Sequence, residues 1–395
     1  MYDDFDDYGE FFDEDLRANL LERAQEALDR GESDEALEYV EEYLEENPLD
    51  VEGLNLCAVA AANLGDDPKA LALYDKALKL DPRNGALHHN YGVLLEKIGE
   101  LDRAVLHYRR SLVLQPDFPE AYINLGNVLD EQGRSDEALA MYDQALRKMP
   151  DAPDAYYNKG FALNRLGRFE EALESFAKAL QIEPQDAASH NGQGFALSGL
   201  GRDEEALVSY AQAISRDSQV ATYPYNRALS LTRLARREEA LADLDTALSL
   251  SPEFYEAMIE KAGVQGDLER FDAAMATLDQ ARVLQPTSPE ADFYQGVLYE
   301  RQGRLEDALT ALNRSLDLDP GAIFALNNKG NVLIDLGRFD EALACFDAII
   351  ARTDSYPLAH YNRACLFALQ KKVRPAVQAL AEAGKADPRF FEDAA

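Results

Sequence analysis

Apolar and small side chains recur along this chain with a period of 34 residues. In each period an alanine is followed four residues later by a large side chain, and three residues after that usually by a small one. Spacings of four and three place these positions on one face of an α-helix. The alanines are Ala36, Ala70, Ala104, Ala138, Ala172, Ala206, Ala240, Ala274, Ala308, Ala342 and Ala376. The large residues are Val40, Tyr74, Tyr108, Tyr142, Phe176, Tyr210, Leu244, Leu278, Leu312, Phe346 and Leu380.

Another helix is expected ahead of this one in every period, so each period holds a first and a second helix, and the alanine column lies on the second. The first helix carries a small residue where two backbones approach closely, usually glycine: Gly92, Gly126, Gly160, Gly194, Gly296 and Gly330. A further glycine, such as Gly133, separates the two helices and permits the left-handed turn that ends the first. Proline then stops the second helix. The prolines on this register are Pro48, Pro82, Pro116, Pro150, Pro184, Pro252, Pro286, Pro320 and Pro388.

This arrangement resembles the tetratricopeptide repeat family, whose unit is a helix-turn-helix of 34 residues. Residues 122–128 and 326–332 match its signature closely. The resemblance implies an all-α, right-handed superhelix, an α-solenoid, of about eleven repeats over residues 17–390. The units are expected to begin near residues 17, 51, 85, 119, 153, 187, 221, 255, 289, 323 and 357, with a short C-terminal tail at 391–395.

Charge narrows the classes of partner. The chain of 395 residues has a formal net charge of −34, which argues against direct binding to nucleic acid or an anionic membrane, because both need Lys and Arg. There is no long apolar run and no signal-like N-terminus, so we expect no membrane span and a cytoplasmic location. The three cysteines have no metal or disulfide spacing, and no cofactor is predicted.

The first sixteen residues carry eight acids and no base, a composition typical of a disordered tail. Their aromatic content suggests a second interpretation, a short linear motif that folds on a partner or docks on the protein's own groove. The alternative is that some of these rings cap the first repeat. The aromatic residues are Tyr2, Phe5, Tyr8, Phe11 and Phe12.

The resemblance places function on the concave face, which the first helix of each unit lines. Much of this lining is aromatic or amide, which suits an extended peptide or a helix. The alternative is that each ring fills space between neighbouring helices. The expected lining is Asn127, Tyr157, Phe161, Asn191, Phe195, Tyr225, Leu229, Phe293, Val297, Phe324, Asn327, Asn331 and Tyr361, with an asparagine column at its edge that includes Asn124, Asn158, Asn226, Asn328 and Asn362.

The asparagine column has two interpretations, a contact to a peptide backbone or a feature of repeats of this kind in general. The next position along each first helix is polar from the fifth unit onward: Lys159, Gln193, Arg227, Lys261, Gln295, Lys329 and Arg363. It falls near the packing seam, so we expect its side chains to lie across apolar surface with their charged ends paired to acids.

The sequence does not support the hypothesis of a catalytic site, since the five histidines have no spacing typical of a metal site. We therefore expect a non-catalytic scaffold or adaptor that binds a protein segment or peptide in its groove. One alternative is a regulatory or substrate-recruiting subunit of a separately encoded enzyme, for example a transferase. Another is an acidic mimic that sequesters a basic protein. The sequence does not predict an oligomeric state.

Overall fold

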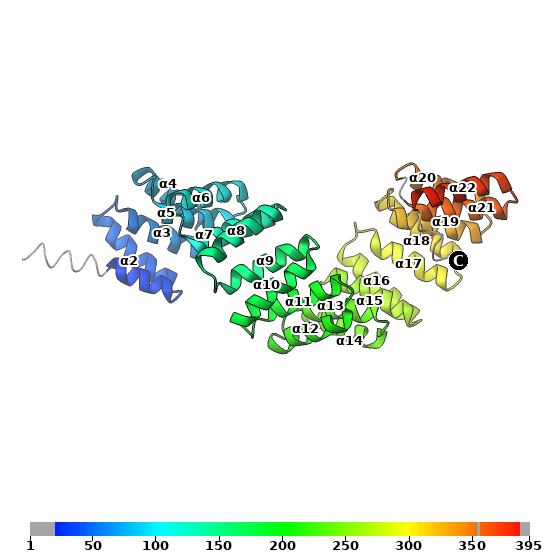
Figure 1. Cartoon of the computed structure of the whole chain (residues 1–395), viewed down its shortest axis with the longest axis horizontal. Coiled ribbons are helices and arrows are strands. Elements are labelled where there is room, and N and C mark those ends of the chain that lie inside the picture. The colour runs from blue at the N-terminus through cyan, green and yellow to red at the C-terminus, as the bar shows by residue number, and fades with distance from the viewer. Residues whose placement is uncertain (1–19, 354–355, 388–395) are drawn as a thin grey trace, which may run out of the picture. The chain divides into compact units, whose positions relative to one another are not determined.

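The computed structural model describes residues 20–353 and 356–387. All the regular structure in this part of the chain is helical, as expected, and the helices fall into two compact units, Met1–Gly201 and Arg202–Ala395 (Figure 1). In unit 1, residues 20–29 are helical and are followed by α2 (Ser33–Glu46), α3 (Val51–Asn63), α4 (Asp67–Leu80), α5 (Gly85–Lys97), α6 (Leu101–Leu114), α7 (Pro119–Glu131), α8 (Ser135–Lys148), α9 (Pro153–Arg165), α10 (Phe169–Ile182) and α11 (Ala187–Gly199).

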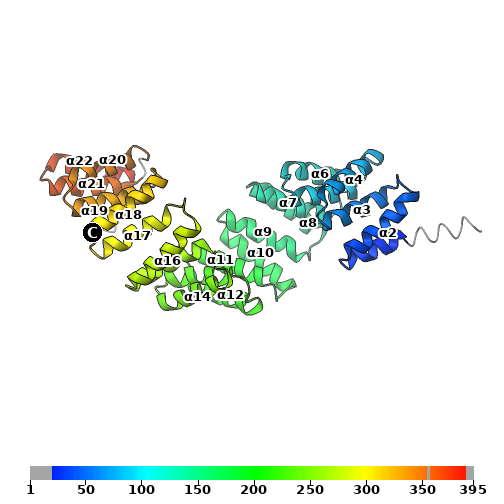
Figure 2. The ribbon, with the colours of Figure 1, turned by 180° about the vertical axis from the view of Figure 1, so that it is seen from behind.

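Unit 2 continues the same alternation (Figure 2). Its helices are α12 (Asp203–Arg216), α13 (Thr222–Arg233), α14 (Arg237–Leu250), α15 (Tyr255–Asp267), α16 (Phe271–Leu284), α17 (Glu290–Arg301), α18 (Leu305–Leu318), α19 (Ile323–Asp335), α20 (Phe339–Ile350), α21 (Pro357–Leu369) and α22 (Val373–Ala386). We call the odd-numbered helices from α3 to α21 first helices and the even-numbered ones second helices.

Each unit is built from contacts between helices close together in the sequence. In unit 1 every helix from α3 to α10 contacts the helices before and after it, and the first helices α3, α5, α7, α9 and α11 also contact one another in order. Unit 2 repeats this pattern from α13 to α21. The first helices of each unit therefore form a continuous layer, which we call the first-helix face.

The turn between the two helices of a repeat needs a left-handed residue. Gly133 adopts a φ of 75° there, where glycine carries no steric penalty. The seventh repeat has Ala235 at the equivalent position, with a φ of 57°. An L-residue in this region costs about 1–2 kcal/mol, so the unusual alanine leaves the turn intact but less favourable.

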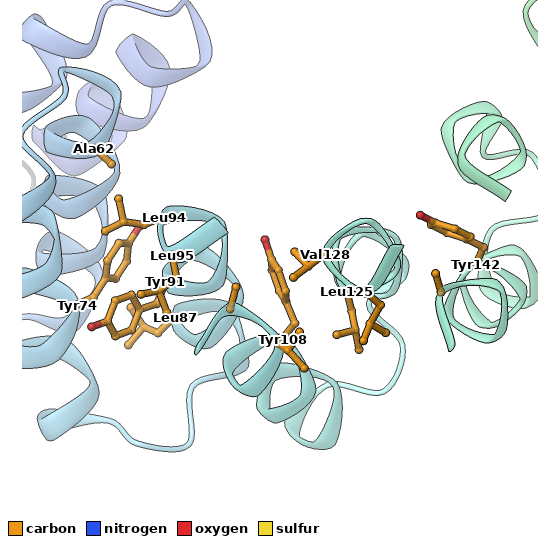
Figure 3. Packing of buried hydrophobic residues seen from close by; sticks show 14 of the residues in the cluster. Ala62, Tyr74, Leu87, Tyr91, Leu94, Leu95, Tyr108, Leu125, Val128 and Tyr142 are labelled. Atoms are coloured by element: carbon orange, nitrogen blue, oxygen red, sulfur yellow. The ribbon is translucent and has the colours of Figure 1, made fainter. Parts of the chain in front are cut away.

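Large side chains of the second helices, such as Tyr108 and Tyr142, pack among the buried side chains of the first helices (Figure 3). Tyr108 and Tyr142 are almost fully buried, and the stacked rings of Tyr74 and Tyr91 lie 5.2 Å apart. A Cβ added to Gly126 would stand 2.5 Å from the Tyr142 ring. The close approach predicted at this glycine is confirmed.

The last second helix departs from the expected pattern. Leu380 of α22 was predicted on a packing face, yet 40% of its surface is exposed. Ala376, in the predicted alanine column, is only half-buried, whereas Ala379 and Ala383 are buried. The physical reason is that no helix within the described residues follows α22.

Some predictions fall outside the described residues. These are the disorder of the 1–16 tail, the role of its aromatic residues Tyr2, Phe5, Tyr8, Phe11 and Phe12, and the tail at 391–395, all of which stay predictions. None of the described helices combines the length and hydropathy that a membrane crossing demands. The expected cytoplasmic location also stays a prediction.

Candidate functional site

The first-helix face of unit 1 presents two phenylalanines to solvent at equivalent positions of successive first helices. Phe161 on α9 is 48% exposed and Phe195 on α11 is 47% exposed. The half-buried ring of Tyr157 stacks on Phe161, with 6.4 Å between centroids, and also contacts Phe176 at 6.1 Å. Phe195 lies 6.4 Å from Phe169. These contacts hold one side of each ring and leave the other side open.

Unit 2 exposes aromatic rings on its own first-helix face. Phe324 on α19 is 68% exposed and lies edge-on to Tyr356, 6.4 Å away. Tyr225 on α13 is half-buried, and its ring centroid lies 4.7 Å from that of Phe254. Phe254 also lines a hollow of about 310 Å³ with Thr222 and Tyr255. The predicted aromatic lining of this unit therefore adjoins a small open recess.

The asparagine column serves contacts between repeats. In unit 1 the Asn90 amide donates to Asn55 Oδ1 at 3.0 Å, and the Asn158 amide donates to Asn127 Oδ1 at 2.9 Å. In unit 2 Asn362 donates to Asn327 Oδ1 at 2.8 Å. We call these inter-repeat hydrogen bonds the asparagine ladder. The ladder favours the interpretation of the column as a structural feature of the repeats over a contact to a bound peptide backbone.

The asparagine ladder engages two of the predicted lining residues in hydrogen bonds within the protein. Asn127 Oδ1 accepts from both Asn158 and the Tyr142 hydroxyl, so its acceptor capacity is used within the protein. Asn327 was predicted to line the open face, but it is only 5% exposed. Its side chain is buried because it accepts a hydrogen bond from Asn362 of the next repeat.

The other predicted site residues divide by exposure. Those most open to solvent are Phe161, Phe195, Phe324 and Tyr361. The half-buried ones are Asn124, Asn127, Tyr157, Asn158, Asn191, Tyr225, Asn226, Leu229, Phe293, Val297, Asn328, Asn331 and Asn362.

Five members of the polar column next to the asparagines contact acids of the second helices, as predicted. Lys159 Nζ lies 2.7 Å from Asp143 Oδ1, and Arg363 Nη1 lies 2.9 Å from Asp347 Oδ1. The Arg227 guanidinium binds Asp243 through two hydrogen bonds of 2.6 Å. The same pairing holds for Lys261 with Asp245 and for Gln295 with Asp279. These side chains stabilise the helix packing, which removes most of their charge from the candidate binding surface.

Two half-buried carboxyl groups form no ion pair with the residues that the structure describes. Burial raises the pKa of Glu96, whose carboxylate accepts the Tyr108 hydroxyl at 2.7 Å. Burial likewise raises the pKa of Glu300, and the nearby Asp335 adds to the rise. Both side chains belong to first helices. Burial therefore disfavours the charged form of both carboxyl groups.

Sequence reasoning missed a pair of histidines. His88 on α5 and His107 on α6 bring their Nδ1 atoms to 3.1 Å, and His88 Nε2 lies 3.3 Å from the Pro82 carbonyl oxygen. Burial, and next the neighbouring His88, lower the pKa of His107 to about 4. The two histidines are nineteen residues apart and lie on different helices, so no short sequence motif identifies the pair. The positions of His88 and His107 within the repeat could have predicted that the two side chains meet.

Metal-binding clusters are not evident in the part of the chain that the structure describes. No group of three or more His, Cys, Asp or Glu side chains there is placed to hold an ion. Two further hollows, of about 420 and 630 Å³, lie away from the predicted residues. The larger involves Pro252, Met258 and Val283.

Protein-family models match most of the chain. A model described as tetratricopeptide repeat matches residues 21–85, 123–187, 225–289 and 261–323. Related models cover residues 97–133, described as TPR repeat, and residues 73–105 and 299–364, both described as tetratricopeptide repeat. No curated protein matches the chain.

Two solved structures with TM-scores of 0.50 or more share the fold, and a third is similar over about half of this chain. Yeast Tom70 is 16% identical, with a TM-score of 0.53 and coverage of 96% of this chain and 93% of Tom70. A tetratricopeptide repeat protein from Parabacteroides merdae is 19% identical, with a TM-score of 0.50 over 63% of this chain and 98% of its own. YrrB, described as a TPR protein with an unusual peptide-binding site, is 28% identical over 47% of this chain and 95% of its own, with a TM-score of 0.40.

Proposed function

Because this chain belongs to the tetratricopeptide repeat family, whose repeats generally mediate protein–protein interaction, we propose that it is a non-catalytic adaptor that binds an apolar protein segment on its first-helix faces. The observation that carries the proposal is the pair of open rings in unit 1. Phe161 and Phe195 stand at the same position of consecutive first helices, each about half exposed. Phe324 offers a third open ring in unit 2.

Energetics favour a partner for these rings. An exposed aromatic ring gives up the burial energy of roughly 25 cal/mol per Å² that it gains inside a protein. The neighbouring Tyr157 packs one side of Phe161 at 6.4 Å, so the ring is already ordered before binding and less side-chain entropy is lost. Ordered aromatic side chains of this kind are frequent hot spots of interfaces.

The bound segment is expected to be apolar with few acids. The formal net charge of −34 disfavours a further carboxylate close to the protein surface. Most bases of the adjoining polar column are already paired to acids, as Lys159 is to Asp143. Apolar side chains flanked by bases suit this surface best.

A displayed peptide library screened with the full chain tests the proposal. Enriched peptides are then measured against the double variant Phe161→Ala with Phe195→Ala and against the control Val113→Ala with Val283→Ala, whose valines are 70% and 81% exposed on second helices. We expect the aromatic variant to bind tenfold or more weakly, since a hot spot contributes about 2 kcal/mol, and the control to bind as the parent does. Equal binding by both variants contradicts the proposal.

Salt separates this function from the alternative of an acidic mimic. Binding through buried apolar contacts persists at high ionic strength, whereas exposed charge pairs are screened within about 3 Å at 1 M salt. Peptide affinity that collapses at 1 M salt, with no dependence on Phe161 and Phe195, supports the mimic instead. A role as a recruiting subunit for a separate enzyme uses the same surface and stays a prediction.

A further inference from the structure

The outer surface of α22 exposes a position that is buried everywhere else. The residues at the register of Leu380 in the ten earlier repeats, from Val40 to Phe346, are at most 2% exposed, whereas Leu380 is 40% exposed. Val373 and Val377 lie on the same side of α22, 69% and 62% exposed. Their counterparts on α20, Phe339 and Leu343, are half-buried. We call Val373, Val377 and Leu380 the terminal stripe.

Basic side chains surround the terminal stripe. Lys371 and Lys372 precede α22, Arg374 lies in its first turn, and Lys385 lies in its last. The first three are exposed and form no ion pair with the described residues, while Lys385 pairs with Glu382 at 2.9 Å. In a chain with a formal net charge of −34, four bases and two acids over residues 371–387 make a local basic region.

The sequence holds one segment with the complementary chemistry. Residues 1–16, ahead of the described part, carry eight acids, no base and five aromatic residues. The acids match the basic rim, and the rings match the exposed valines and leucine of the terminal stripe. A peptide of sixteen residues spans at most about 56 Å, enough to cover a helix of 14 residues about 21 Å long.

We propose that the acidic segment, residues 1–16, of one copy of this chain docks on the terminal stripe of a second copy. The contact is heterologous, since it joins different surfaces of the two copies, so it leads to open chains or closed rings of molecules joined head to tail. It also covers the last described repeat, as the terminal repeats of a solenoid require. This association is independent of peptide binding at Phe161 and Phe195.

Sedimentation velocity of the full chain tests the proposal over a hundredfold range of concentration. We expect the average mass to rise with concentration and to fall at 1 M salt, where charge attraction is screened. The triple variant Lys371→Glu, Lys372→Glu, Arg374→Glu and a chain lacking residues 2–16 should each stay monomeric. The control variant Arg83→Glu, Arg147→Glu, Lys178→Glu makes the same charge change at exposed positions of unit 1 and should associate as the parent does.

Mixing the two defective proteins gives the decisive result. The triple variant still offers the acidic segment, and the shortened chain still offers the terminal stripe, so together they should form a one-to-one dimer that neither forms alone. Circular dichroism establishes that each is helical. A parent chain that stays monomeric throughout, association that survives the triple variant, or no dimer in the mixture overturns the proposal. If residues 388–395 or the chain's own N-terminus cover the terminal stripe instead, the parent chain stays monomeric, and that result overturns the proposal.

Discussion

Side chains on the two helices of a repeat are matched in volume at single contacts. In α19 a Cβ on Gly330 would lie 2.6 Å from the ring of Phe346, which is fully buried on α20. In α15 a Cβ on Gly263 would meet nothing within 4 Å. Close packing therefore requires glycine at Gly330 but leaves room for a larger side chain at Gly263. Substitution of each glycine by alanine measures the difference.

We expect Gly330→Ala to lower the free energy of unfolding by about 1–3 kcal/mol, because the Phe346 ring must move to admit the methyl group. Gly263→Ala, the matched control, should raise it by up to about 1 kcal/mol through helix propensity alone. Urea unfolding followed by circular dichroism measures both. Destabilisation of similar size in the two variants would show that close approach is not the reason for Gly330.

Residue types predicted the packing better than they predicted the site. Glycine at Gly126 and tyrosine at Tyr142 follow from the repeat register alone, because volume complementarity is local to one helix pair. The burial of Asn327 does not, since it depends on how the next repeat presents Asn362. An amide has no preferred face of its own, so its direction is decided only when neighbouring helices pack.

Between elements, buried polar groups link adjacent helices as much as apolar ones do. The His88 and His107 rings join α5 to α6 with their Nδ1 atoms 3.1 Å apart. Burial lowers the pKa of His107 to about 4, against about 6.5 for an unfolded histidine. Tyr91 lies edge-on to His107 at 4.5 Å and binds Asp75 and Arg103, while Arg110 lies near His88.

Acid should therefore weaken this helix pair. Between pH 6.5 and about 4 the unfolded chain binds a proton at His107 that the folded chain does not, so the free energy of unfolding falls as the pH falls through this window. We expect His107→Gln to lose this part of the pH dependence. Urea unfolding at pH 7, 5.5 and 4.5 measures it, and the carboxyl groups common to both proteins cancel in the difference. Parallel pH profiles for the two proteins would contradict the assignment.

At the scale of the whole molecule, we expect self-repulsion to outweigh the exposed ion pairs. The formal net charge is −34, whereas exposed pairs such as Arg168–Glu171 and Arg202–Glu205 typically contribute only about 0.2–1 kcal/mol each. Added salt screens both, but it removes more repulsion than attraction.

We expect the thermal midpoint to rise by roughly 2 °C between 10 mM and 0.5 M NaCl, equivalent to one or two kcal/mol for a protein of this size. Differential scanning calorimetry measures the midpoint. A midpoint that falls with salt would show that the ion pairs outweigh the repulsion.

The whole fold was predictable because one helix pair is repeated, so each column of the sequence reports the same contact many times. The terminal stripe was not predictable in this way. Leu380 has the same residue type and register as the buried Leu312, and only the absence of a described helix after α22 distinguishes them. A periodic sequence therefore specifies its interior well and its ends poorly.

The sequential contacts between helices have a mechanical consequence. Within each unit the contacts from α3 to α22 join helices that are adjacent or next but one in the chain, so a pulling force applied at one end is resisted only by the outermost helix pair. Under tension such a unit should peel off one repeat at a time, each releasing a similar length of chain, and rewind in the reverse order when the load is removed. Each unit is therefore expected to lengthen repeat by repeat under load.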